Sequence, residues 1–114
     1  MTIAKRNLSV TCILALALSS AASASTTRAT IKELLISESL VYVYPTGGVL
    51  NPPGCHGSNG NYYSFSFNRP RAKEYLAGLL AAKSQGATVI FYGTGNCTDQ
   101  PNISETLSYF SIVE

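Results

Sequence analysis

The sequence predicts a small, mainly β domain: a five-stranded, OB-fold-like barrel with one helix between its third and fourth strands. Several short segments alternate apolar and polar residues with period two, which is typical of half-buried strands. One segment, residues 68–86, has helical spacing. Together they give the order β-β-β-α-β-β, which is the chain order of an OB fold. An α+β sheet with one packed helix has the same order and is the alternative.

The N-terminal segment has the features of a secretory signal peptide over residues 1–24. Lys5 and Arg6 supply positive charge, an apolar run follows, and Ala22-Ser23-Ala24 matches an A-x-A cleavage site. An uncleaved anchor is the alternative, but the apolar run is too short to span a bilayer. We expect cleavage after Ala24, a single mature domain over residues 25–114, a secreted or periplasmic location and no membrane span.

Cleavage also changes the charge of the product. The whole chain has eight Lys and Arg residues against six Asp and Glu residues, and the two bases of the leader account for the excess. A neutral domain lacks the basic patch that is typical of nucleic-acid binding. We therefore expect no nucleic-acid partner.

The first half of the mature chain is dominated by predicted strands. Residues 25–29 are expected to be a polar lead-in. Residues 30–44 alternate and are rich in β-branched and aromatic side chains, with a bend or bulge at Ser37-Glu38-Ser39. A helix over residues 31–35 is the competing interpretation. After a turn at residues 45–48, Val49 and Leu50 are expected to return as a short strand.

A loop and another strand follow. Residues 51–61 hold two prolines, three glycines and three asparagines, which excludes regular structure. Residues 62–67 alternate, with Tyr63, Phe65 and Phe67 on one face, so this strand is expected to be half buried. We expect Phe65, Phe67 and Phe91 to pack in the core.

Residues 68–86 form the predicted helix. Pro70 suits its first position, and Gly86 suits the position after its last turn. The face expected to pack on the sheet consists of Ala72, Leu76, Leu79, Leu80 and Lys83, with Tyr75 beside it. Strands are predicted at residues 88–92 and 106–113.

Cys55 and Cys97 remain after cleavage, and an even number of cysteines in an exported domain predicts a disulfide. The bridge closes a loop of about 43 residues and is expected to stabilise the domain by roughly 4 kcal/mol. A Cys55–His56 nucleophile pair is the disfavoured alternative.

One His and two Cys cannot complete a tetrahedral metal site, and the acidic residues are scattered singly. We expect no metal, no cofactor and no catalytic residues.

The candidate ligand-binding residues are aromatic and polar side chains outside the expected core. A tyrosine offers an apolar ring and a polar tip, which suit a wet binding surface, and planar amides suit sugar hydroxyls. The candidates are Tyr42, Tyr44, His56, Asn59, Asn61 and Tyr62. Packing of the tyrosines in a subunit interface is the alternative.

Arg69 and Arg71 flank Pro70 at the start of the predicted helix, where a cation opposes the helix dipole. We expect exposed charges that favour solubility. An anionic ligand or a partner's carboxylate at that end is the alternative.

The segment from Leu76 to Tyr92, L-A-G-L-L-A-A-K-S-Q-G-A-T-V-I-F-Y, joins a helix of small and apolar residues through a glycine to an aromatic-rich strand. In this it resembles the binding (B) subunits of pentameric AB toxins, above all the subtilase cytotoxin B subunit and its relatives in the typhoid and pertussis toxin group. The likeness extends loosely over residues 30–113. The chain also resembles small exported bacterial proteins of unassigned role, through Gly54-Cys55 before an aromatic strand and G-x-G-x-C at residues 93–97.

The resemblance implies a homopentamer with helices lining a central pore, a host glycan or glycoprotein bound to each protomer, a separate enzymatic A subunit and a role in virulence. The polar residues of this chain do not align with the sialic-acid contacts of those toxins, so the sugar is open. We expect a non-enzymatic, glycan-recognising module. The alternative is a disulfide-stapled periplasmic or secreted protein that binds or inhibits another protein.

Overall fold

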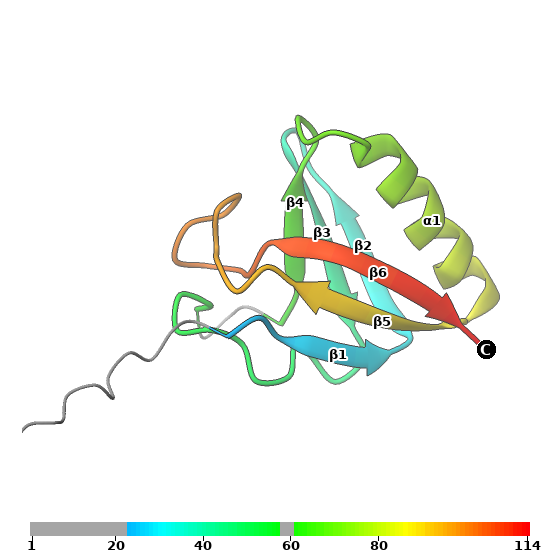
Figure 1. Ribbon diagram of the computed structural model, residues 1–114. Helices are drawn as coiled ribbons and strands as arrows, with labels where there is room; N and C mark the ends of the chain where they lie inside the picture. The colour runs from blue at the N-terminus through cyan, green and yellow to red at the C-terminus, as the bar shows by residue number, and fades with distance from the viewer. Residues whose placement is uncertain (1–22, 58–60) are drawn as a thin grey trace, which may run out of the picture.

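The computed structural model describes residues 23–57 and 61–114, and Figure 1 shows how its elements are arranged. The elements are β1 (Thr26–Ala29), β2 (Ile31–Ile36), β3 (Leu40–Pro45), β4 (Tyr63–Ser66), α1 (Ala72–Gln85), β5 (Thr88–Gly93) and β6 (Leu107–Val113). The predicted mainly β class and the single helix are confirmed. The predicted signal peptide lies outside the described residues, apart from Ser23 and Ala24.

The strands form two three-stranded sheets, in the orders β1-β5-β6 and β2-β3-β4. Neighbouring strands within each sheet are antiparallel. β1 and β2 are successive parts of one stretch interrupted at Thr30, so that the first part pairs with β5 and the second with β3. A parallel bridge between Ser64 and Thr106 links β4 to the residue before β6. The six strands do not close into a continuous barrel.

Two of the sequence predictions about strands are wrong. Residues 25–29 are not a lead-in, because Thr26–Ala29 form β1 and pair with β5. Their polar sequence hid the strand, since the inward side chain is a buried threonine, Thr27. Val49 and Leu50 are not a strand.

The core lies between the two sheets and the helix. Val41 and Val43 of β3, Phe65 of β4 and Val89 and Phe91 of β5 are fully buried. Burial of a side chain of this size contributes roughly 1.5–3 kcal/mol. The predicted packing of Phe65 and Phe91 is confirmed.

The helix covers the open side between β2 and β6 (Figure 1). Its buried residues are Ala72, Leu79 and Ala82, and Tyr75 packs beside them. The predicted face is wrong in part, because Leu80 is 48% exposed and Lys83 is exposed. The helix is rotated because Tyr75 packs between the rings of Phe65 and Phe110, at centroid distances of 5.8 and 5.7 Å.

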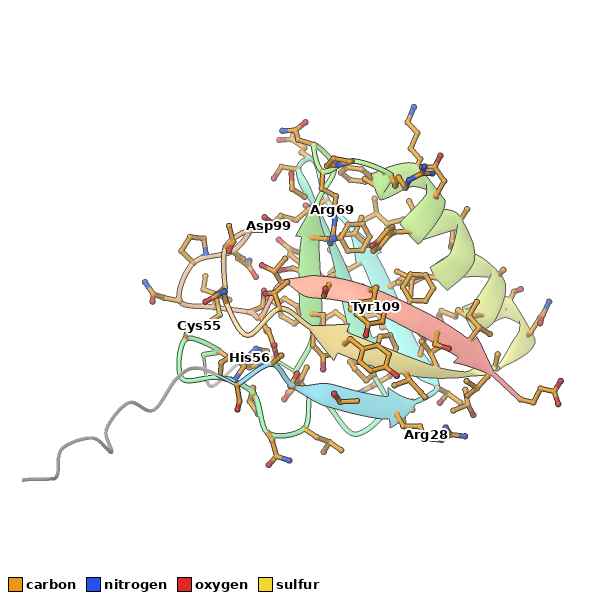
Figure 2. The ribbon with its side chains drawn as sticks, viewed as in Figure 1. Arg28, Cys55, His56, Arg69, Asp99 and Tyr109 are labelled. Carbon is orange, nitrogen blue, oxygen red and sulfur yellow. A yellow bond between two sulfur atoms is a disulfide. The ribbon has the colours of Figure 1, made fainter. Side chains whose placement is uncertain are left out.

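The helix begins at Ala72, two residues after Pro70, so Pro70 is not its first residue. Arg71 precedes it in the left-handed conformation, with φ 65°. The Arg69 guanidinium donates to the carbonyl oxygens of Leu107 and Ser108 and lies 4.5 Å from the Tyr75 ring centroid (Figure 2). Arg69 is therefore not a solvated charge, because it ties the β4–α1 connection to β6.

Candidate functional site

Three of the predicted binding residues form an aromatic cluster on the outer face of the β2-β3-β4 sheet. Tyr42 and Tyr44 alternate on β3 with the buried Val41 and Val43, so their side chains point away from the core. The Tyr62 ring centroid lies 5.0 Å from that of Tyr42 and 4.9 Å from that of Tyr44. We call these three side chains the tyrosine face.

Tyr62 is held in place by the connection between β5 and β6. Its hydroxyl donates to Gln100 Oε1 at 2.9 Å, and Gln100 Oε1 also accepts from Ser104 Oγ at 2.6 Å. Partial burial, opposed by the hydrogen bond to Gln100, raises the pKa of Tyr62, and partial burial together with the neighbouring Tyr62 raises the pKa of Tyr44. Both side chains therefore remain neutral phenols near neutral pH.

An open hollow of about 280 Å³ lies beside Tyr44. It is lined by Lys32, Glu33, Tyr44, Pro45, Gly47, Gly48 and Asn61. Gly47 and Gly48, which line the hollow, take positive φ angles of 89° and 84°, which glycine adopts without strain. The hollow thus offers the aromatic ring of Tyr44 together with an amide, a carboxylate and an ammonium group. These groups suit a small polyhydroxylated ligand.

The structure places the six predicted binding residues differently. Tyr42, Tyr44 and Tyr62 form the tyrosine face, and Asn61 lines the same hollow as Tyr44. His56 serves another region, since its Nδ1 accepts the backbone N–H of Glu105 at 2.9 Å. Asn59 lies outside the described residues.

The predicted disulfide is present. Cys55 and Cys97 are bonded, with their Cα atoms 6.0 Å apart. Figure 2 shows Cys55 and His56 together at the end of the molecule where the loops gather. The cysteines therefore have a structural role in the described protein.

A buried polar network lies behind these loops and was not predicted. Glu105 is fully buried, and its carboxylate accepts from Ser25 N at 3.1 Å, from Ser25 Oγ at 2.5 Å and from Gly95 N at 2.8 Å. A lone glutamate between a serine and a threonine, directly before the strand predicted at residues 106–113, carries no signal of burial.

The network extends through hydroxyl groups to β1 and β4. Tyr63 Oη lies 2.7 Å from Ser25 Oγ and 2.9 Å from Thr27 Oγ1, and Leu50 N donates to Thr27 Oγ1 at 3.1 Å. Because each hydroxyl has one proton and Ser25 donates to the carboxylate, Tyr63 donates to Ser25 and Thr27 donates to Tyr63. Burial, only partly offset by these hydrogen bonds, raises the pKa of Tyr63.

A second aromatic surface lies on the outer face of the β1-β5-β6 sheet. Tyr92 and Tyr109 are cross-strand partners whose rings stack at 4.3 Å, and Tyr109 is 54% exposed (Figure 2). An exposed stacked pair of this kind is typical of a contact surface.

Among residues 23–57 and 61–114, no cluster of His, Cys, Asp and Glu side chains could hold a metal ion. The helix of the described structure is not long and apolar enough to cross a membrane. No protein-family description, no curated protein and no solved structure matches this chain.

Proposed function

We propose that this protein is an exported, non-enzymatic carbohydrate-binding module. The observation that carries the proposal is the tyrosine face beside a polar hollow lined by Glu33, Lys32 and Asn61. An aromatic ring packs against the C–H face of a sugar, and amide and carboxylate groups bind its hydroxyls. The neutral phenol of Tyr44 adds a donor and an acceptor beside the hollow. The Tyr62 hydroxyl, which donates its proton to Gln100, adds an acceptor on the tyrosine face.

The strand pairing supports an open OB-type barrel as the fold. A first stretch shared by both sheets, the parallel bridge between Ser64 and Thr106, and a helix after the three-stranded meander all suit that fold. In OB folds the face of the second and third strands, with the adjacent loops, binds oligonucleotides and oligosaccharides. Here β3 and β4 take that place, and the tyrosine face lies on and beside them. The neutral mature charge favours a sugar over a nucleic acid.

Substitution of Tyr44 by alanine is expected to weaken glycan binding by about tenfold or more, since a central aromatic contact is lost. The experiment starts from a glycan array with the exported, processed protein and continues with calorimetric titration of the best sugar. Tyr109→Ala is the matched control, because it removes an exposed tyrosine from the other sheet. Silence on every glycan, or equal losses in both variants, would contradict the proposal.

We further propose that the module works as a homopentamer, as in the toxin B subunits it resembles, and carries a separate enzymatic A subunit to a host glycan. The outer side of α1 supports assembly, because Ala77, Leu80 and Ala81 are exposed there and apolar. Native mass spectrometry of the oxidised mature protein is expected to give five copies, and Leu80→Glu is expected to shift the mass to the monomer. A wild-type monomer would count against both the pentamer and the toxin role.

The second candidate function is binding or inhibition of another protein. The stacked Tyr92 and Tyr109 favour it, because aromatic side chains are enriched at protein interfaces. The Tyr109→Ala variant separates the two functions. If this variant loses a protein partner that the wild type binds stoichiometrically, and neither of the two proteins binds sugar, the result favours this second candidate.

A further inference from the structure

The Glu105 carboxylate lies in a closed pocket built from three separate segments. Ser25 precedes β1, Gly93 ends β5, and Gly95 lies in the connection that follows β5. A Cβ atom on Gly93 would lie 2.0 Å from Glu105 Oε2, so the carboxylate rests directly on the glycine backbone. The side chain has no exposed surface.

The hydrogen bonds to this carboxylate within the described structure come from uncharged donors. They are the Ser25 amide and hydroxyl and the Gly95 amide. Burial of an ionised carboxylate is costly unless a positive charge pairs with it. The pocket is therefore suited to a cation at one of these donor positions.

Ser25 occupies the position where such a cation can arise. It is the first residue after the predicted cleavage site, and its backbone nitrogen already lies 3.1 Å from Glu105 Oε2. Ala24 is exposed, whereas Ser25 is 3% exposed. The boundary between exposed and buried residues thus coincides with the Ala24–Ser25 bond.

We propose that the Glu105 pocket binds the new N-terminus of this chain, and that cleavage between Ala24 and Ser25 creates a buried ion pair between the Ser25 α-ammonium group and Glu105. A signal peptidase breaks the C–N bond with one water molecule. The hydroxyl goes to the Ala24 carbonyl carbon, and the hydrogen goes to the Ser25 nitrogen. The amine then takes one proton from solvent, and the Ala24 carboxylic acid releases one. The inference rests on the proposed export and not on sugar binding.

The pair gives the mature protein a pH dependence. Pairing stabilises the protonated amine, so its contribution is present below about pH 8, where free α-amino groups titrate, and is lost as the pH rises beyond that range. The other titratable groups that face the pocket are Tyr63 of β4 and His56 of the connecting loop. Tyr63 loses its proton only at higher pH, because burial raises its pKa.

The test uses the full chain, exported and processed by a bacterial host. Intact mass is expected to place the N-terminus at Ser25. Reductive methylation at neutral pH, read residue by residue by mass spectrometry, is expected to modify the Ser25 amine at least about tenfold more slowly in the native protein than in concentrated urea. The exposed Lys32 and Lys73 are internal standards whose rates should hardly differ between the two conditions.

Two variants separate the ion pair from simple burial. Glu105→Gln keeps the shape and removes the charge, so the native Ser25 amine is expected to react at a rate near that in urea. Ser25→Ala removes the hydroxyl and keeps the ammonium group, so protection is expected to persist. If Glu105→Gln does not fold, the wild-type comparison still tests whether the amine is protected, and loss of wild-type stability as the pH rises above about 8 tests the ion pair.

An N-terminus at another residue, or a Ser25 amine that reacts as fast in the native protein as in urea, would overturn the inference. Sugar binding is measured separately. A protein that binds glycans with an unprotected amine overturns only the ion pair, and a protected amine in a protein silent to glycans overturns only the proposed function.

Discussion

Replacement of Gly93 by alanine is expected to destabilise the domain by roughly 3–5 kcal/mol, a large part of the stability of a small domain. The new Cβ would lie 2.0 Å from Glu105 Oε2 and 2.2 Å from Glu105 Cδ. The carboxylate cannot move aside without leaving its hydrogen bonds to Ser25 and Gly95, and no solvent is in reach of this buried group. The variant must therefore break the network or displace β5 from β1.

Urea unfolding of the purified protein measures this loss. Gly54→Ala is the matched control, because a Cβ at Gly54 meets nothing within 4 Å. Glu105→Ala removes the carboxylate with which the new methyl group collides, so Gly93→Ala combined with Glu105→Ala is expected to lose less than the sum of the single variants. A Gly93→Ala protein that unfolds at the wild-type urea concentration would show that the pocket is not closed around Glu105.

The parts of this fold that the sequence predicts well are those with a local cause. Alternation marks residues 62–67 as a strand because Tyr63 and Phe65 must share a face, and the structure buries both. The pairing of Cys55 with Cys97 has no local cause, but it is predictable because the expected loss of the leader leaves two cysteines and one possible pair. The clustering of Tyr42 and Tyr44 follows from their places on one face of a strand.

The parts that it does not predict depend on partners distant in the chain. The sequence of β1 is polar, so it shows no apolar alternation. Its inward residue is Thr27, which can be buried because its hydroxyl forms a hydrogen bond with Tyr63, 36 residues away. The rotation of α1 depends on Phe110, which contacts Tyr75 from another strand. Glu105 is buried because Ser25 and Gly95 reach it, and neither its neighbours nor its spacing indicates this.

The same distinction applies to the candidate site. Tyr62 is a candidate by its residue type, whereas its orientation depends on Gln100, which comes from the connection between β5 and β6. His56 is a candidate on the same chemical grounds, yet its Nδ1 accepts from the backbone N–H of Glu105. Residue chemistry therefore nominates candidates, and only the tertiary pairing decides which of them share a surface.

Removal of the disulfide by the double substitution Cys55→Ser and Cys97→Ser is expected to cost about 4 kcal/mol, because the bridge restricts the unfolded chain over a separation of 42 residues. The bridge also fixes the loop before β4 to the segment after β5. Beside it, Gly57 N donates to Ile103 O at 2.8 Å and Glu105 N donates to His56 Nδ1 at 2.9 Å. The loop that carries these contacts thus helps to hold the Glu105 segment in place.

Chemical denaturation of the oxidised wild type and the double variant measures the loss, and reduction of the wild type is expected to reproduce it while leaving the double variant unchanged.

Hydrogen exchange separates the two contributions of the bridge. If the bridge acts only on the unfolded chain, its removal lowers the global stability. The exchange protection of the Glu105 amide then falls by no more than that of the core amides. Loosening of the native loop exposes that amide selectively, because its acceptor is His56, next to Cys55. A loss below about 1 kcal/mol would contradict this prediction. It would mean that the loop is already ordered in the unfolded chain or is held by its hydrogen bonds alone. The disulfide would then not be the covalent stabilisation that a domain of this size requires.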